Sequence, residues 1–148
     1  MILRLPLLAL LTIASVLAQE NQPALTPLEK AFQDSMSNVT LAGRFSRQGG
    51  TNLSDDKYVI DKVTKLKDDL WQVDAVVPFR GQNLKIPISV HIKWAGDTPV
   101  IELTDELVPS MGKYTVRLVI YRGQYAGMWS AGEGRGGQMF GTITKTAP

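Results

Sequence analysis

From Val39 onward, apolar and polar residues alternate with a period of two, the pattern of β-strands with one buried face. The clearest stretch spans residues 84–94, where an apolar residue stands at every second position: Leu84, Ile86, Ile88, Val90, Ile92 and Trp94. Pro87 lies on the opposite side of this stretch and has no backbone N–H to donate. We therefore expect a bulge or a free edge at Pro87.

The same alternation predicts eight strands in all, separated by short segments rich in Gly, Asp and Asn. The expected strands span residues 39–46, 57–66, 71–79, 84–94, 100–103, 114–121, 124–130 and 138–144. In the second strand the alternation slips between Ile60 and Val63. This slip predicts a β-bulge near Asp61-Lys62.

One segment ahead of the strands has a helical period instead. Thr26 and Glu29 have the spacing of a capping box, and Pro27 stands at the first helical position. Three apolar residues then recur four positions apart: Leu28, Phe32 and Met36. We expect a short helix over residues 27–36 that offers one apolar face to the strands.

Short connections favour antiparallel pairing between strands that follow one another in the sequence. A meander of eight antiparallel strands has exposed edges unless it closes on itself, and closure gives a barrel that holds side chains or one small ligand. The sequence thus predicts an all-β protein, an eight-stranded antiparallel meander closing into a lipocalin-like barrel. A two-layer sandwich stays open as the alternative.

The first 18 residues have the order of a secretory signal peptide. Arg4 precedes an almost wholly apolar run over residues 5–17, and small residues follow at the cleavage position. The run is shorter than the roughly 20 residues that span a bilayer. We expect cleavage after Ala18 or Gln19, export to the periplasm or the extracellular space, and a single domain over residues 19–148 with no transmembrane segment.

Composition narrows the function classes. The chain has no Cys, which excludes a disulfide scaffold, a cysteine nucleophile and a lipid anchor on an N-terminal Cys. Its formal net charge of +2 is too close to neutral to indicate nucleic acid as a partner. No cofactor is expected.

The region around Gly43-Arg44-Phe45 resembles the first strand of the lipocalin and avidin group of calycin barrels. Lipocalins have Trp where this chain has Phe45, and the C-terminal helix typical of them is missing. The segment 121–130, with the glycine loop and Phe140-Gly141-Thr142-Ile143 after it, resembles the ending of uncharacterised exported bacterial proteins. The resemblance implies a calycin-like barrel and export, and it carries over no functional residue.

The segment 132–137 fits the dinucleotide-binding pattern G-x-G-x-x-G, but a strand follows it where that motif needs a helix. The glycines are therefore interpreted as a hairpin loop. Arg135 in this loop remains a candidate for holding an anion.

Other polar candidates have simpler explanations. His91, the only histidine, lies on the polar side of its strand without a second His or Cys to share a metal, so a solvated surface position is expected. The acidic pairs Asp55-Asp56, Asp68-Asp69 and Asp105-Glu106 are assigned to turns or strand ends, where Asp is favoured. Calcium at one of these turns stays open, and no set of residues supports an enzyme.

Aromatic residues at alternating strand positions are the candidate ligand-binding set: Trp71, Phe79, Trp94, Tyr114, Tyr125 and Trp129. They would line a cavity for a small apolar or amphipathic ligand, or they would simply fill the core. Two hypotheses follow. The first is an exported non-enzymatic protein that binds such a ligand inside the barrel. The second is an envelope or extracellular interaction module with a filled core, which uses Arg135 and the outer side of residues 114–121.

Overall fold

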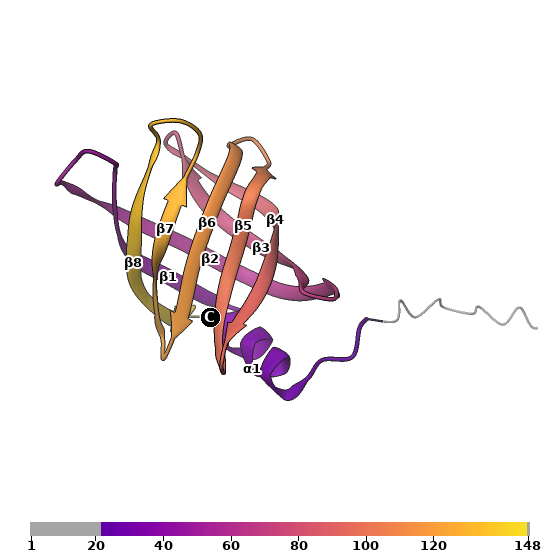
Figure 1. Ribbon diagram of the computed structural model, residues 1–148. Helices are drawn as coiled ribbons and strands as arrows, with labels where there is room; N and C mark the ends of the chain where they lie inside the picture. The colour runs from indigo at the N-terminus through magenta and orange to yellow at the C-terminus, as the bar shows by residue number, and fades with distance from the viewer. Residues whose placement is uncertain (1–21, 148) are drawn as a thin grey trace, which may run out of the picture.

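The computed structural model describes residues 22–147 (Figure 1), and the predicted signal peptide lies outside them. One helix precedes eight strands in this part of the chain. Their bounds are α1 Pro27–Met36, β1 Val39–Ser46, β2 Leu53–Lys67, β3 Leu70–Phe79, β4 Gln82–Ala95, β5 Thr98–Val108, β6 Gly112–Tyr121, β7 Gln124–Ser130 and β8 Gly136–Lys145.

The strands form a closed antiparallel barrel in which each strand pairs with its neighbours in the sequence. Pairing between β1 and β8, from Val39↔Lys145 to Phe45↔Met139, closes the sheet. The predicted all-β barrel is therefore confirmed, and the sandwich alternative is wrong. Closure leaves no edge strand at the two ends of the meander.

Several local predictions are also confirmed. The helix α1 has the expected bounds, with the Thr26 hydroxyl accepting from the Glu29 N–H and the Glu29 carboxylate accepting from the Thr26 N–H. The register of β2 shifts between Ile60 and Lys62, where the bulge was expected.

Two of the three acidic pairs do not lie where the sequence placed them. Asp68-Asp69 is a turn, but Asp55-Asp56 lies inside β2, and Asp105-Glu106 lies inside β5 at a second register shift. The predicted strands 57–66 and 100–103 were too short, because Asp was assigned to turns from its local preference alone. Pairing with the neighbouring strands outweighs that preference here.

Pro87 lies on a free edge, one of its two expected settings. β4 pairs with the whole of β3 through its residues 82–91, from Leu70↔His91 to Phe79↔Gln82. It pairs with β5 only over His91–Ala95. The part of β4 that contains Pro87 therefore needs no N–H donor toward β5.

The helix α1 closes the lower end of the barrel in Figure 1. Phe32 and Met36 are buried, and the Phe32 ring packs edge-on against Trp71 at a centroid distance of 5.3 Å. The Lys65 ammonium lies 2.7 Å from the Glu29 carboxylate and ties the helix to β2. Within residues 22–147 no helix has the length and hydropathy of a membrane span.

Candidate functional site

The half of the barrel away from α1 is hollow. It encloses a cavity of about 690 Å³ that opens between the loops at that end. Its walls are mostly aliphatic and come from all around the barrel, and they include Leu41, Val73, Ile88, Leu103, Leu118 and Met139. Pockets that hold small organic ligands have volumes of about 300–1,000 Å³ and walls of this kind.

Four glycines stand at inward-facing positions of the barrel wall. Strand alternation places Gly43, Gly127, Gly137 and Gly141 on the inward side of β1, β7 and β8, so these positions send no side chain into the barrel. Gly43 pairs with Gly141 at the closing seam. A Cβ on Gly43 would overlap the carbonyl oxygen of Phe140. Glycine at this position therefore allows the two strands of the closing seam to approach closely.

Three of the predicted ligand-binding aromatics line the cavity: Phe79, Tyr114 and Trp129. Phe45, which the sequence did not single out as a ligand-binding residue, joins them and meets Trp129 edge-on at a centroid distance of 6.0 Å. Together these rings form an aromatic collar on the cavity wall.

The other three predicted aromatics are elsewhere. Trp71 and Tyr125 are buried, with 1% and 2% of their surface exposed, and neither lines the cavity. Trp94 lines a separate groove of about 530 Å³ between α1 and the barrel rim. The aromatics were expected to line a cavity or to fill the core as one set, whereas the structure divides them between the two roles.

Asp56 is an acidic group in the cavity wall. The residue is only 7% exposed, and its Oδ2 atom has no hydrogen-bond partner. Burial raises the pKa of its carboxyl, and the nearby Tyr58 hydroxyl and Lys57 backbone N–H only partly oppose the rise. The signal for Asp56 was present in the sequence, since it alternates with Tyr58 and Ile60 on the same side of the strand.

Two further polar atoms are buried without a partner. They are the Tyr125 hydroxyl and the Trp129 indole Nε1. Burial and the negative charge of Asp56 raise the pKa of Tyr125 to about 12. Native proteins leave only a few buried polar atoms unsatisfied, and these three come from inward-facing residues of the barrel.

Arginines surround the opening of the cavity. Arg47, Arg80 and Arg135 line it from the ends of β1, β3 and the β7–β8 loop. Two guanidinium groups lie over aromatic rings, Arg47 at 5.0 Å from the Phe45 centroid and Arg80 at 5.1 Å from the Phe79 centroid. Among residues 22–147, none of the three has an acidic partner within 4.0 Å. The predicted anion-holding Arg135 thus belongs to a cationic mouth.

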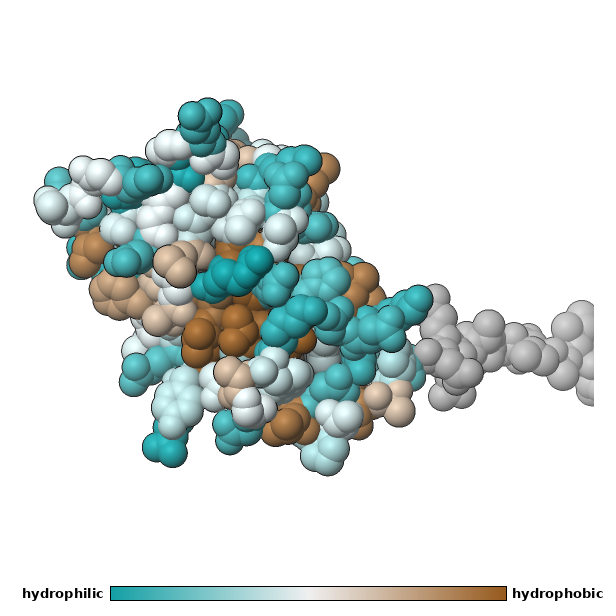
Figure 2. All heavy atoms as spheres, viewed as in Figure 1, coloured by the Kyte–Doolittle hydropathy of each residue, from teal (hydrophilic) through white to brown (hydrophobic). Residues whose placement is uncertain are grey.

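The outside of the barrel carries exposed apolar side chains on β6, β7 and β8. They are Val119, Tyr121, Met128 and Phe140. The register pairs Val119 with Ala126 and Ala126 with Phe140, which makes the patch continuous across the three strands. In Figure 2, hydrophobic residues gather in the middle of this face among hydrophilic ones.

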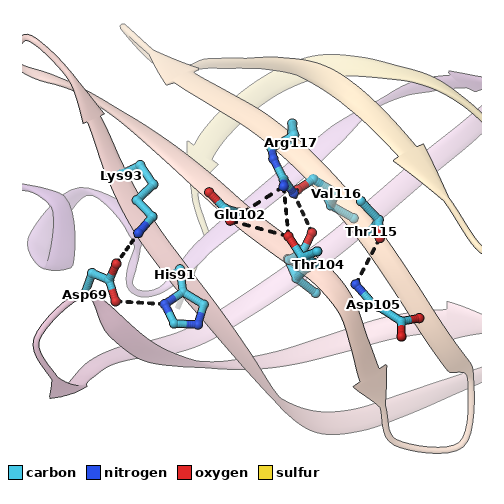
Figure 3. A network of polar contacts seen from close by, with 10 residues as sticks. Asp69, His91, Lys93, Glu102, Thr104, Asp105, Thr115, Val116 and Arg117 are labelled. Atoms are coloured by element: carbon cyan, nitrogen blue, oxygen red, sulfur yellow. Dashed lines mark hydrogen bonds and ion pairs between the residues drawn. The ribbon is translucent and has the colours of Figure 1, made fainter.

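A polar network covers β4, β5 and β6 on the outside (Figure 3). His91 Nδ1 lies 2.8 Å from Asp69 Oδ1, and Lys93 donates to the other oxygen of Asp69. These two hydrogen bonds lower the pKa of Asp69 to about 2. Arg117 lies 3.5 Å from Glu102 and donates to the Leu103 carbonyl at 2.6 Å. The network holds neighbouring strands together, and the predicted surface position of His91 is confirmed.

The arrangement can enclose a ligand. In the described part of the chain no three His, Cys, Asp or Glu side chains group as metal ligands do. The cavity combines aliphatic walls, an aromatic collar, one buried carboxyl and a cationic mouth. Comparisons of the chain with protein-family models, curated proteins and solved structures gave no match.

Proposed function

We propose that this protein is an exported, non-enzymatic binding protein that holds a small apolar or amphipathic ligand inside its barrel. The single observation that carries the proposal is the cavity of about 690 Å³ with aliphatic walls and an open mouth. A filled core would bury these side chains against one another, and an empty space deprives them of those contacts. A ligand of matching size would restore the contacts.

The cavity has apolar walls inside and arginines at its opening, and this combination suits an amphipathic ligand. Its apolar body would lie against residues such as Val116 and Leu118, and a polar end would remain near the arginines of the mouth. The Arg47 and Arg80 side chains rest on aromatic rings, and this position holds their charges beside the entrance.

The apolar patch on β6–β8 favours a second candidate function, an interaction module. The patch and the cavity lie on opposite sides of the barrel wall. The second function would therefore use Val119 and its outward neighbours and would not require the cavity.

Titration with the fluorescent probe N-phenyl-1-naphthylamine tests the proposal. Val116→Phe places a larger side chain in the cavity, and Val119→Phe makes the same change on the outer side of the same strand. We expect the wild type and Val119→Phe to bind the probe alike, and Val116→Phe to bind at least about tenfold more weakly because the volume is occupied. Probe binding that Val116→Phe leaves unchanged, or no binding by the wild type, contradicts the proposal.

A further inference from the structure

The barrel fold does not require an acidic side chain at position 56. In the described chain it is the one polar or charged residue among those buried. Its side chain is in the cavity wall, and no cationic group lies within 4.0 Å of it. A buried acid without a cation or a complete set of hydrogen bonds destabilises a fold.

The neighbouring acid shows the contrast. Asp55 also borders the cavity, but 94% of its side chain is exposed and it lies 3.3 Å from Arg44 Nε. The Asp55 carboxylate is therefore solvated and paired, whereas Asp56 is buried in the cavity wall beside Tyr58. A strand that needed only a filled inward position would be served by Leu or Val at residue 56.

The surrounding charges define which ligand group suits Asp56. A carboxylate only accepts hydrogen bonds, so the ligand must bring a donor. The arginines of the mouth repel a cationic ligand, and Asp56 repels an anionic group placed beside it. A neutral donor avoids both penalties, and a hydroxyl is the simplest such group.

We propose that Asp56 is the polar anchor of the cavity and selects neutral ligands that carry a hydroxyl group on an apolar body. This inference rests on the proposed binding function. It adds a specificity-determining residue and a chemical class of ligand.

Competition between two matched ligands tests the inference. 1-Decanol and 1-methoxydecane share an apolar chain, but only the alcohol donates a hydrogen bond. Each would displace N-phenyl-1-naphthylamine from the wild type, from Asp56→Leu and from Asp61→Leu. Asp61 is the control because it lies on the same strand and pairs with Lys85 at 3.1 Å, and it is not part of the cavity wall.

We expect the wild type and Asp61→Leu to prefer the alcohol by about tenfold, the ratio that one hydrogen bond to a buried carboxyl gives. Asp56→Leu should bind both compounds and lose the preference. It should also melt about 5 °C higher than the wild type, because the buried acid is gone. If Asp56→Leu does not fold, Asp56→Asn, which keeps the side-chain size, should reduce the preference without abolishing probe binding.

Several results would overturn the inference while leaving the binding function in place. An alcohol preference that survives in Asp56→Leu places the anchor elsewhere. Tighter binding of decylamine or decanoate than of decanol, measured in the same assay, assigns the ligand to a charged class. A lower melting temperature in both Asp56→Leu and Asp56→Asn shows that Asp56 serves the fold. If the wild type binds neither the probe nor any of the four compounds, the proposed function itself fails.

Discussion

The two ends of the barrel are built from the same kinds of residue but are packed differently. At the closed end, α1 places Phe32 and Met36 against Trp71, and the side chains there are almost completely buried. At the open end, Phe79 and Trp129 line an empty cavity below the loops. Aromatic residues thus contribute packing at one end and a lined space at the other.

The difference shows how one small barrel combines stability with a binding site. The closed end is fastened by several independent contacts, including the Glu29–Lys65 ion pair and the hydrogen bond from Gln33 Nε2 to the Val63 carbonyl at 3.0 Å. Burial disfavours the charged form of Glu29, but Lys65 and the Thr26 N–H more than compensate, so the pKa of Glu29 is lowered. With one end so fastened, the other can remain hollow without losing the fold.

Truncating one phenylalanine at each end is expected to give the largest contrast. Phe32→Ala empties a packed site, and we expect a loss of about 3–5 kcal/mol in the free energy of unfolding. Phe79→Ala removes a ring that already borders a cavity, and we expect about 1–2 kcal/mol because fewer contacts are lost. Urea unfolding followed by circular dichroism measures both. Equal losses would contradict the difference in packing.

The closing seam between β1 and β8 provides the next test. Gly43→Ala puts a methyl group onto the Phe140 carbonyl across the closing seam, and we expect a loss of about 3 kcal/mol. Gly50→Ala is the control, because its methyl group would meet only the Arg47 carbonyl at 3.4 Å. We expect that variant to stay within about 0.5 kcal/mol of the wild type. A Gly43→Ala variant as stable as Gly50→Ala would show that the seam does not need the close approach.

Enlarging one valine in each half is expected to have a smaller effect. Val63 is 1% exposed in the packed half, and Val77 lines the cavity. Val63→Phe should cost about 1–3 kcal/mol because a filled core has no room for the ring. Val77→Phe should cost less and should weaken binding of N-phenyl-1-naphthylamine. Thermal melts and probe titration distinguish the two variants. A larger loss of stability in Val77→Phe than in Val63→Phe would contradict the placement of the cavity at the open end.

The smallest expected effects concern two carboxylates, one inside the cavity and one outside. The pKa of Asp69 is lowered to about 2, so its contribution to stability is present above about pH 4 and is lost as the pH falls toward 2. The pKa of Asp56 is raised, so its charged form destabilises the fold at neutral pH, and this penalty disappears below about pH 4.

Melting temperatures of Asp56→Asn and Asp69→Asn between pH 2 and pH 7 measure these opposite dependences. At pH 7, Asp56→Asn should be more stable than the wild type and Asp69→Asn less stable. The gain of Asp56→Asn should shrink toward pH 4, and the loss of Asp69→Asn should shrink toward pH 2. If the melting temperature at pH 7 rises in both variants, or falls in both, then Asp56 and Asp69 do not have the opposite environments assigned to them.

The sequence predicted the features that depend on neighbouring residues. Strand alternation, the capping box of Thr26 and Glu29 and the bulge after Ile60 are all local signals, and the structure confirms them. Which aromatic residues pack in the core and which line the cavity was not predictable, because Trp71 and Trp129 fit the strand alternation equally well. Which of the two is packed depends on where α1 docks. The closing seam likewise depends on Gly43 and Gly141, which are far apart in the sequence and meet only in the closed sheet.

The position of Asp56 was predicted wrongly for a different reason. Its spacing from Tyr58 put it on the inward side, but the preference of Asp for turns was given more weight. Which residues of a strand point inward is decided by its whole buried face. The alternation with Tyr58 was therefore a stronger signal than the turn preference of Asp.

Native mass spectrometry of the protein, purified from its own source, tests the central claim most directly. We expect a bound small molecule whose mass disappears on denaturation, and tandem spectra of the released compound would give its chemical class. A bare polypeptide mass, together with no uptake of N-phenyl-1-naphthylamine or of the alkyl ligands, would contradict the claim that the cavity of about 690 Å³ is a binding site.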